Sequence, residues 1–97
     1  MTFKVKLKIG FFKTQLYDLV ISQGQMFWRP QEKSEAALLI KNSELESVCL
    51  IKKNGGETEL EIVTSDAVYV GILVTGDDFS RLKQVLAKEF GNKFSFT

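Results

Sequence analysis

Apolar and polar side chains alternate along the beginning of the chain. Apolar residues stand at the odd positions from Phe3 to Phe11, whereas Lys4, Lys6 and Lys8 occupy the even positions between them. Successive side chains of a β-strand point to opposite faces, so a two-residue period predicts a half-buried strand. We expect the apolar face of this strand to contact the core and its lysines to face water.

Six further segments with the character of strands follow. Gln23-Gly24 is a predicted hairpin turn, and Asn54-Gly55 predicts a hairpin of type I′, because such turns need positive φ angles. Pro30 should end the third strand, since proline cannot donate a hydrogen bond to a β-ladder. The six predicted strands cover residues 16–22, 25–29, 37–41, 47–53, 57–63 and 67–74.

A short polar segment interrupts the strands in the middle of the chain. Ser43 and Glu46 have the spacing of a capping box, in which each side chain satisfies a free backbone N–H group. This spacing predicts a single helical turn over residues 42–46. We expect Leu45, the apolar residue within it, to turn inward.

The strand predicted at 67–74 is apolar on both of its faces. A strand of this kind needs cover on both sides. Two explanations are open: a partner subunit covers the second face, or the strand lies in a twisted, nearly closed barrel. Val68, Val70, Ile72 and Val74 form one face, and Ala67, Tyr69, Gly71 and Leu73 form the other.

The period changes near Thr75, from two residues to the 3.6 residues of an amphipathic helix. We predict this helix at about residues 77–90, with Thr75 or Asp77 as its N-cap and Gly91 at its C-terminal end. The tail, residues 91–97, either adds an edge strand or remains free. The apolar stripe of the helix, which must cover the open end of the sheet, comprises Phe79, Leu82, Val85, Leu86 and Phe90.

This order of elements, about seven antiparallel strands and then one helix, resembles the pleckstrin-homology (PH)-like superfold. The resemblance runs from Phe3 to Phe90 and is best over Leu38–Val48, which an Asn-Gly hairpin follows. It implies a mostly β split barrel capped by a C-terminal helix, with residues 1–97 as one domain, similar to small bacterial PH-like proteins. Members of the superfold bind phosphoinositide headgroups, phosphotyrosine or proline-rich peptides, or other proteins.

Composition narrows the classes of function. The 97 residues suit one domain, and a formal net charge of +1 argues against nucleic-acid binding, which needs a basic excess. The chain has no histidine, no metal-ligand spacing and no phosphate loop, so we expect a protein that is not an enzyme and uses no cofactor. Cys49 is the single cysteine, in an apolar run where a buried, inert thiol is expected. The lack of a possible disulfide favours a reducing, cytoplasmic location.

Three features are candidate surfaces for a protein partner or a second copy. The first is the strand face with Val68, Val70 and Ile72. The second is Trp28, since tryptophan is enriched in interface hot spots, although it could instead plug one end of the barrel. The third is the edge of the fifth strand around Val48 and Leu50, which the resemblance implies is open to an added peptide strand unless Lys52 and Lys53 guard it.

The alternative ligand is an anionic membrane surface, bound through Lys4, Lys6, Lys8 and Lys13. Lipid-binding members also carry basic residues on the second strand, but this one holds Asp18 and no basic residue. The lysines could equally form a solvated face, paired with a row of glutamates at 57, 59 and 61. The sequence therefore favours a protein-interaction or self-association module, with weak binding to lipid headgroups as the alternative.

Overall fold

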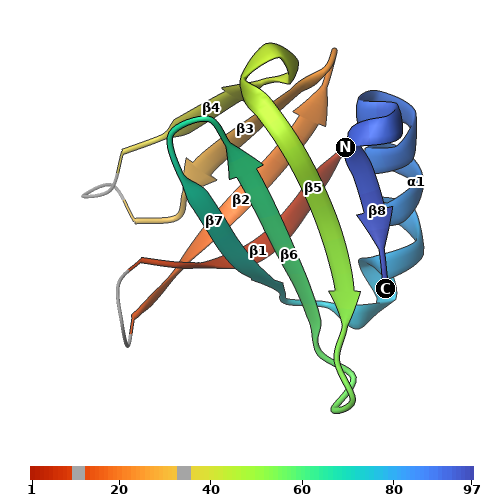
Figure 1. Ribbon diagram of the computed structural model, residues 1–97. Helices are drawn as coiled ribbons and strands as arrows, with labels where there is room; N and C mark the ends of the chain where they lie inside the picture. Colours follow the sequence, from red (N-terminus) through yellow and green to blue (C-terminus); the bar gives the residue numbers. More distant parts are fainter. Residues whose placement is uncertain (10–12, 33–35) are drawn as a thin grey trace.

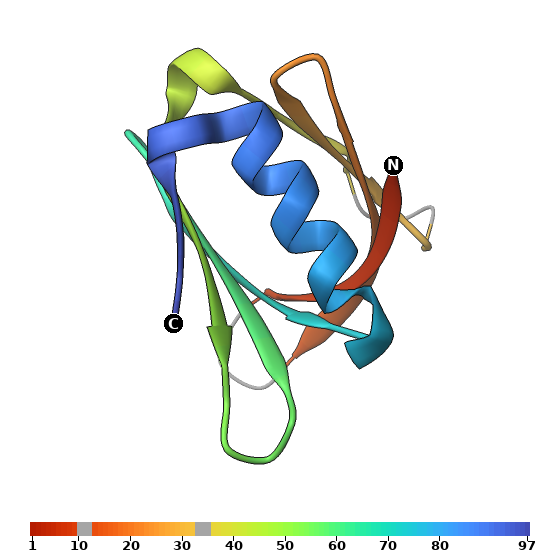
Figure 2. The same cartoon turned by 90° about the vertical axis from the view of Figure 1, so that its right-hand side faces the viewer.

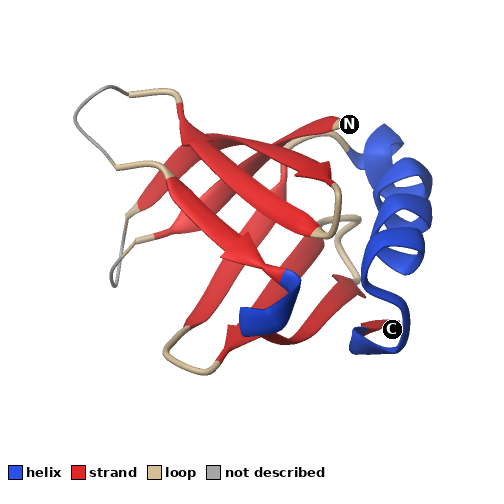
Figure 3. Cartoon of the chain, turned by 90° about the horizontal axis from the view of Figure 1, so that it is seen from above, coloured by secondary structure: helices blue, strands red, loops and turns tan. Residues whose placement is uncertain are grey.

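The computed structural model describes residues 1–9, 13–32 and 36–97, apart from the side chain of Asp77; the predicted strand position Phe11 lies outside this part. Within these residues, eight strands, one α-helix and three short 3-10 helices are formed; Figures 1 and 3 show how they are arranged. The strands are β1 (Thr2–Lys8), β2 (Thr14–Ser22), β3 (Gln25–Pro30), β4 (Leu38–Lys41), β5 (Leu45–Lys52), β6 (Thr58–Thr64), β7 (Val68–Leu73) and β8 (Phe94–Phe96). The helices are η1 (Asn42–Glu44), η2 (Gly76–Asp78), α1 (Phe79–Phe90) and η3 (Gly91–Lys93).

All strands belong to one curved sheet, with the order β4-β3-β2-β1-β7-β6-β5-β8. Neighbouring strands are antiparallel except for β8, which pairs with β5 in parallel. β1 joins the two halves of the sheet because it pairs with both β2 and β7. The sheet curls into a barrel that is split between its two edge strands, β4 and β8, and α1 lies across the open side with β8 next to it (Figures 1 and 2).

The core fills the space between the curved sheet and α1. On β1 the buried residues are Phe3, Val5 and Leu7, and the intervening lysines are exposed, as the alternation predicts. Leu82, Leu86 and Phe90 of α1 are buried, and Phe79 and Val85 pack against the same core. The fold class predicted from the sequence, a mostly β barrel capped by one C-terminal helix, is therefore confirmed.

Of the two predicted hairpin turns, one has the expected geometry and the other does not. Gln23 and Gly24 both have positive φ, 54° and 71°, as a type I′ turn requires. In the β5–β6 hairpin the residue with positive φ is Gly56, at 85°, so the type I′ turn predicted for Asn54-Gly55 is wrong. There the Gly56 N–H donates to the Lys53 carbonyl (3.0 Å), the pattern of a longer loop with a glycine in the left-handed position.

Two caps also differ from their predictions. The short turn is η1, where the carboxylate of Glu44 accepts a hydrogen bond from the Lys41 backbone N–H (3.1 Å), so the Ser43–Glu46 box is not formed. Leu45 is buried as predicted, but as the first residue of β5. α1 begins two residues later than expected because η2 precedes it; its N-cap is Asp78, which makes no side-chain capping hydrogen bond.

Candidate functional site

The outer face of β7 carries an apolar stripe. We call Val68, Val70, Ile72 and Val74 the β7 stripe; the opposite face of the strand, with Gly71 and Leu73, is buried against the core. Val68 is 60% exposed and Val74 is 44% exposed, and the two residues between them are half-buried. The strand is therefore fully covered on its inner side and only partly covered on its outer side.

Rows of opposite charge flank the β7 stripe. Ile72 is paired with Lys6 of β1 on one side and with Glu59 of β6 on the other. Along the same registers, Val70 is paired with Glu61, and the Val74 N–H donates to the Lys4 carbonyl (3.1 Å). We call residues Lys4, Lys6 and Lys8 the lysine row and residues Glu57, Glu59 and Glu61 the glutamate row.

Contacts between the rows are long. Lys8 Nζ lies 3.9 Å from a carboxylate oxygen of Glu59, and Lys53 Nζ lies 4.0 Å from the same oxygen. Lys6 makes no ion pair with any residue in the described part of the chain. The prediction that the lysines pair with glutamates across the sheet thus holds for Lys8, and only at the limit of an ion pair.

Lys4 belongs to a separate polar cluster on the first half of the sheet. Its Nζ donates to Asp18 (3.1 Å), and the other carboxylate oxygen of Asp18 accepts from Gln31 (2.8 Å) and Arg29 (3.5 Å). Partial burial acts to raise the pKa of Asp18, but the hydrogen bonds and charges of Lys4 and Arg29 outweigh it and hold the pKa below its ordinary value. Asp18 therefore stays ionised and neutralises part of the basic charge near β1.

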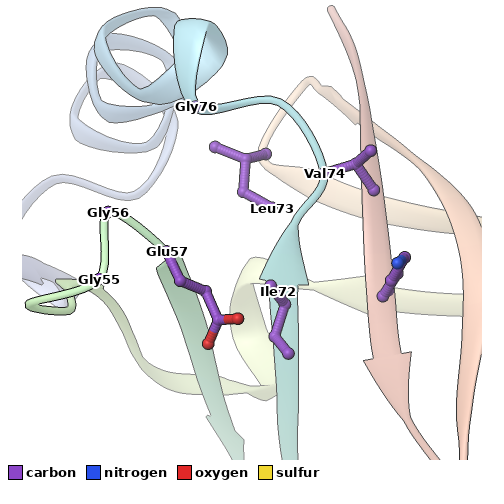
Figure 4. A pocket seen from close by; sticks show the side chains of 8 residues that line it. Gly55, Gly56, Glu57, Ile72, Leu73, Val74 and Gly76 are labelled. Carbon is purple, nitrogen blue, oxygen red and sulfur yellow. The ribbon is translucent and has the colours of Figure 1, made fainter.

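A hollow of about 350 Å³ continues from the lower end of the β7 stripe. It lies between the β5–β6 hairpin, the end of β7 and η2 (Figure 4). Ile72 and Val74 of the stripe contribute to its wall, as does Lys6 of the lysine row. The remaining lining residues are Gly55, Gly56, Glu57, Leu73 and Gly76.

A second exposed apolar group lies at the other end of the sheet and was not predicted. Phe27 of β3 is paired with Val20 of β2 and Leu39 of β4, so the three side chains share the outer face. Phe27 is 38% exposed and Leu39 is 44% exposed. Alternation would have revealed them, because Met26 and Trp28 point inward and Phe27 must then point outward. We call Val20, Phe27 and Leu39 the edge patch.

Three residues predicted to contact a partner are buried. Trp28, Val48 and Leu50 have no exposed surface, so as surface contacts these predictions are wrong. Trp28 instead packs in the core, with its ring edge-on to Tyr17 (6.1 Å between centroids), which agrees with the alternative that it plugs the barrel.

The edge of β5 is not open either. The tail forms β8 on it, with Val48 paired to Phe94 and Leu50 to Phe96. The Thr97 N–H donates to the Leu50 carbonyl (2.9 Å), and the Lys52 N–H donates to the Thr97 carbonyl (3.0 Å). Of the two expectations for the tail, the edge strand is confirmed, and the open peptide groove is corrected.

Chemical sites are not assembled in the residues that the structure describes. They contain no cluster of three or more Cys, Asp or Glu side chains that could hold a metal ion. Cys49 is half-buried rather than buried, with Glu61 as its neighbour on β6. Neither α1 nor another described helix has the length and apolar character to cross a bilayer. Of the predicted set, Val68 and the lysines are exposed, and Val70 and Ile72 are half-buried.

Comparison with known proteins supports the fold. No family model matches the sequence, and no curated protein matches it. The architecture is that of a PH-like domain, a split barrel closed by one C-terminal helix. A solved structure described as that of the Spt16D Pob3N heterodimer contains a similar chain, with a TM-score of 0.70 and 11% sequence identity. The match covers 100% of this chain and 53% of that chain, so this chain spans about half of the similar one.

Proposed function

We propose that this chain is a non-catalytic binding module that docks a protein partner on the β7 stripe. The observation that carries this proposal is an apolar row on the outside of a strand in the middle of the sheet, with Val68 60% exposed at its end. Contiguous apolar surface rimmed by charged residues is typical of interaction sites. The lysine and glutamate rows supply such a rim along both sides of the stripe.

The fold and the composition are consistent with this proposal. PH-like domains are typically non-catalytic binding modules, and the similar chain belongs to a heterodimer. The sequence contains no histidine, and no described serine or cysteine is hydrogen-bonded to a side chain that could act as its base. These points favour binding over catalysis without naming the partner.

Charge pairing argues against the alternative, a membrane surface bound through the lysines. Attraction to anionic lipids requires unneutralised basic residues at one surface. Lys4 is paired with Asp18, and Lys8 lies beside Glu59. Lys6 and Lys13 are the members of the predicted set without an ion pair among the described residues.

Site-directed photo-crosslinking in cells tests the proposal. Replacing Val68 with a photo-reactive phenylalanine analogue should give protein adducts. The same replacement at Ala87, an exposed position on α1, should give none. A further variant at Leu39 reports on the edge patch. Adducts at Leu39 but not at Val68 would place the docking surface elsewhere.

Sedimentation with liposomes tests the lipid alternative in parallel. Under the proposal, the protein does not sediment with anionic liposomes more than with neutral ones. Sedimentation that is lost in Lys6→Glu/Lys13→Glu, together with no adducts at Val68, would replace the protein partner with a lipid surface.

A further inference from the structure

We propose that the partner seated on the β7 stripe is a second copy of this chain, related by a two-fold axis that runs along β7 between the two copies. This inference rests on the proposed function, because it assumes that the β7 stripe is the docking surface. It adds the identity of the occupant and the geometry of the contact. The two sheets would stack face to face by their outer surfaces.

The arrangement of charge selects this geometry. The lysine row lies on the β1 side of the stripe, and the glutamate row lies on the β6 side. Rotation by half a turn about an axis along the strand exchanges the two sides, so each lysine row meets the glutamate row of the partner. A two-fold axis perpendicular to the strands would instead place the β1 side of one copy against the β1 side of the other. Lysines would then face lysines, and this repulsion opposes association.

The register of the sheet makes the contact specific. Lys6, Ile72 and Glu59 lie at one level, since β1, β7 and β6 pair there. A two-fold axis along the strands does not shift residues along it, so each level meets the same level of the second copy. Ile72 then packs on Ile72 of the partner subunit, and Lys6 meets Glu59 of the partner subunit. Stacked sheets cross at an angle of about 30°, so the two β7 strands diverge on either side of the point where they cross. The level-by-level pairing is therefore confined to the middle of β7.

The residues involved are available for such a contact. Lys6 has no ion pair among the described residues, and the carboxylate of Glu59 is approached by lysine ammonium groups at no less than 3.9 Å. A standard interface buries roughly 800 Å² on each partner. The chain exposes 5871 Å² and measures 33 × 32 × 23 Å, so one face of the molecule can supply that area.

The competing structure is a monomer in which lysine stems cover the stripe. Long lysine side chains can lay their methylene groups over apolar surface while the ammonium group stays in water. Lys8, which reaches toward Glu59 across the outer face, is oriented in this way. The two structures differ in how they respond to charge reversal, because only the dimer contains contacts between the rows of different copies.

Two complementary variants distinguish them. The acidic variant, Lys6→Glu/Lys8→Glu, makes two positions of the lysine row negative, opposite a glutamate row that is already negative. The basic variant, Glu59→Lys/Glu61→Lys, makes two positions of the glutamate row positive, opposite a lysine row that is already positive. We expect the wild type to sediment as a dimer and each variant to dimerise at least about tenfold more weakly. An equimolar mixture should form a heterodimer, because every acidic row then meets a basic row. Lys88→Glu, at an exposed position on α1, is the matched control and should leave dimerisation unchanged.

The outcomes separate this inference from the proposed function. A wild type that is monomeric at high micromolar concentration overturns the inference, as do variants that still dimerise alone or that fail to combine in the mixture. If Val68 nevertheless crosslinks to a different protein, the proposed function stands without the second copy. Should either charge variant not fold, Val68→Glu tests dimerisation on its own, because it places a carboxylate at the exposed end of the apolar stripe. A Val68→Glu variant that dimerises as tightly as the wild type overturns the inference.

Discussion

A glycine inside the barrel offers the sharpest test of the structure. Gly71 of β7 is paired with Leu7 of β1 and Leu60 of β6, and it faces the core. A Cβ atom added to Gly71 would lie 2.6 Å from Cγ1 of Val5, which is closer than non-bonded carbon atoms approach one another in folded proteins. Val5 is fully buried and branched at Cβ, which restricts the rotamers by which its methyl group could move away.

The expected cost of Gly71→Ala follows from two opposing effects. Forcing an extra methyl group into a packed core costs about 1–3 kcal/mol. Alanine restricts the unfolded chain more than glycine does, which returns about 0.4–1 kcal/mol. The net loss in the free energy of unfolding should therefore not exceed about 2.6 kcal/mol, and we expect it near the middle of this range, at about 1–2 kcal/mol, or a fall in Tm of about 5–15 °C for a domain of this size.

Urea unfolding followed by the fluorescence of Trp28 measures this loss. Trp28 is the only tryptophan and is fully buried, so its emission should shift to longer wavelength on unfolding. The midpoint should fall while the slope with denaturant stays constant. A stability equal to or above that of the wild type would contradict the packing described for β1 and β7.

A double-mutant cycle with Val5→Ala tests the cause of the loss. Val5→Ala alone removes two buried methyl groups and should cost about 2 kcal/mol. It also clears the space that the new Cβ at position 71 needs. The double variant should therefore lose less than the sum of the single variants, by at least about 1 kcal/mol. Additive losses would mean that the two residues do not clash.

Three further predictions concern other parts of the fold. Leu86→Ala should lower the free energy of unfolding by about 2–5 kcal/mol, because this side chain of α1 is fully buried. The control Ala87→Ser, on the exposed side of α1, should change it by no more than about 0.5 kcal/mol, and urea midpoints measure both effects. Gln23 has a φ of 54°, in the left-handed region that asparagine adopts more readily than glutamine does. Gln23→Asn should therefore raise the free energy of unfolding by up to about 1 kcal/mol and raise Tm with it. An unchanged Tm would argue against this turn. The folded-state pKa of Asp18 is lowered, so its stabilising effect exists above the unfolded pKa and is lost as pH falls through the folded value. The advantage of the wild type over Asp18→Asn should thus be present at neutral pH and vanish in acid, as measured by urea midpoints across pH.

The spacing of apolar residues predicts the strands and the helix because the same spacing determines which side of each element is buried. β1 is buried at its odd positions, and α1 buries the predicted stripe residues Leu82, Leu86 and Phe90. Local patterns of this kind do not depend on knowing the neighbours of a strand. Pairing does depend on them, and so β8 could be anticipated as an edge strand but not assigned to a partner, since three residues carry too little pattern to specify β5.

Residue type alone is a poor predictor of which side chains of β3 reach the surface. The enrichment of tryptophan in interfaces predicts a surface contact for Trp28, yet this residue shares its face with Met26, and both are fully buried. The neighbouring Phe27, which this parity turns outward, is the exposed large apolar residue of β3. The position of a side chain within the strand was a better guide to exposure than its chemical identity.

The β7 stripe was correctly placed on one face of its strand, but the two explanations offered for it are not exclusive. β7 does close the barrel, because it pairs with β1 and β6, and this closure buries Gly71 and Leu73. Closing a barrel covers only the inner face of a strand. The outer face gains nothing from it, and there Val68 remains 60% exposed. An explanation for the outer valines must therefore come from a contact outside the barrel or from the lysine stems beside them, and charge reversal distinguishes these two causes.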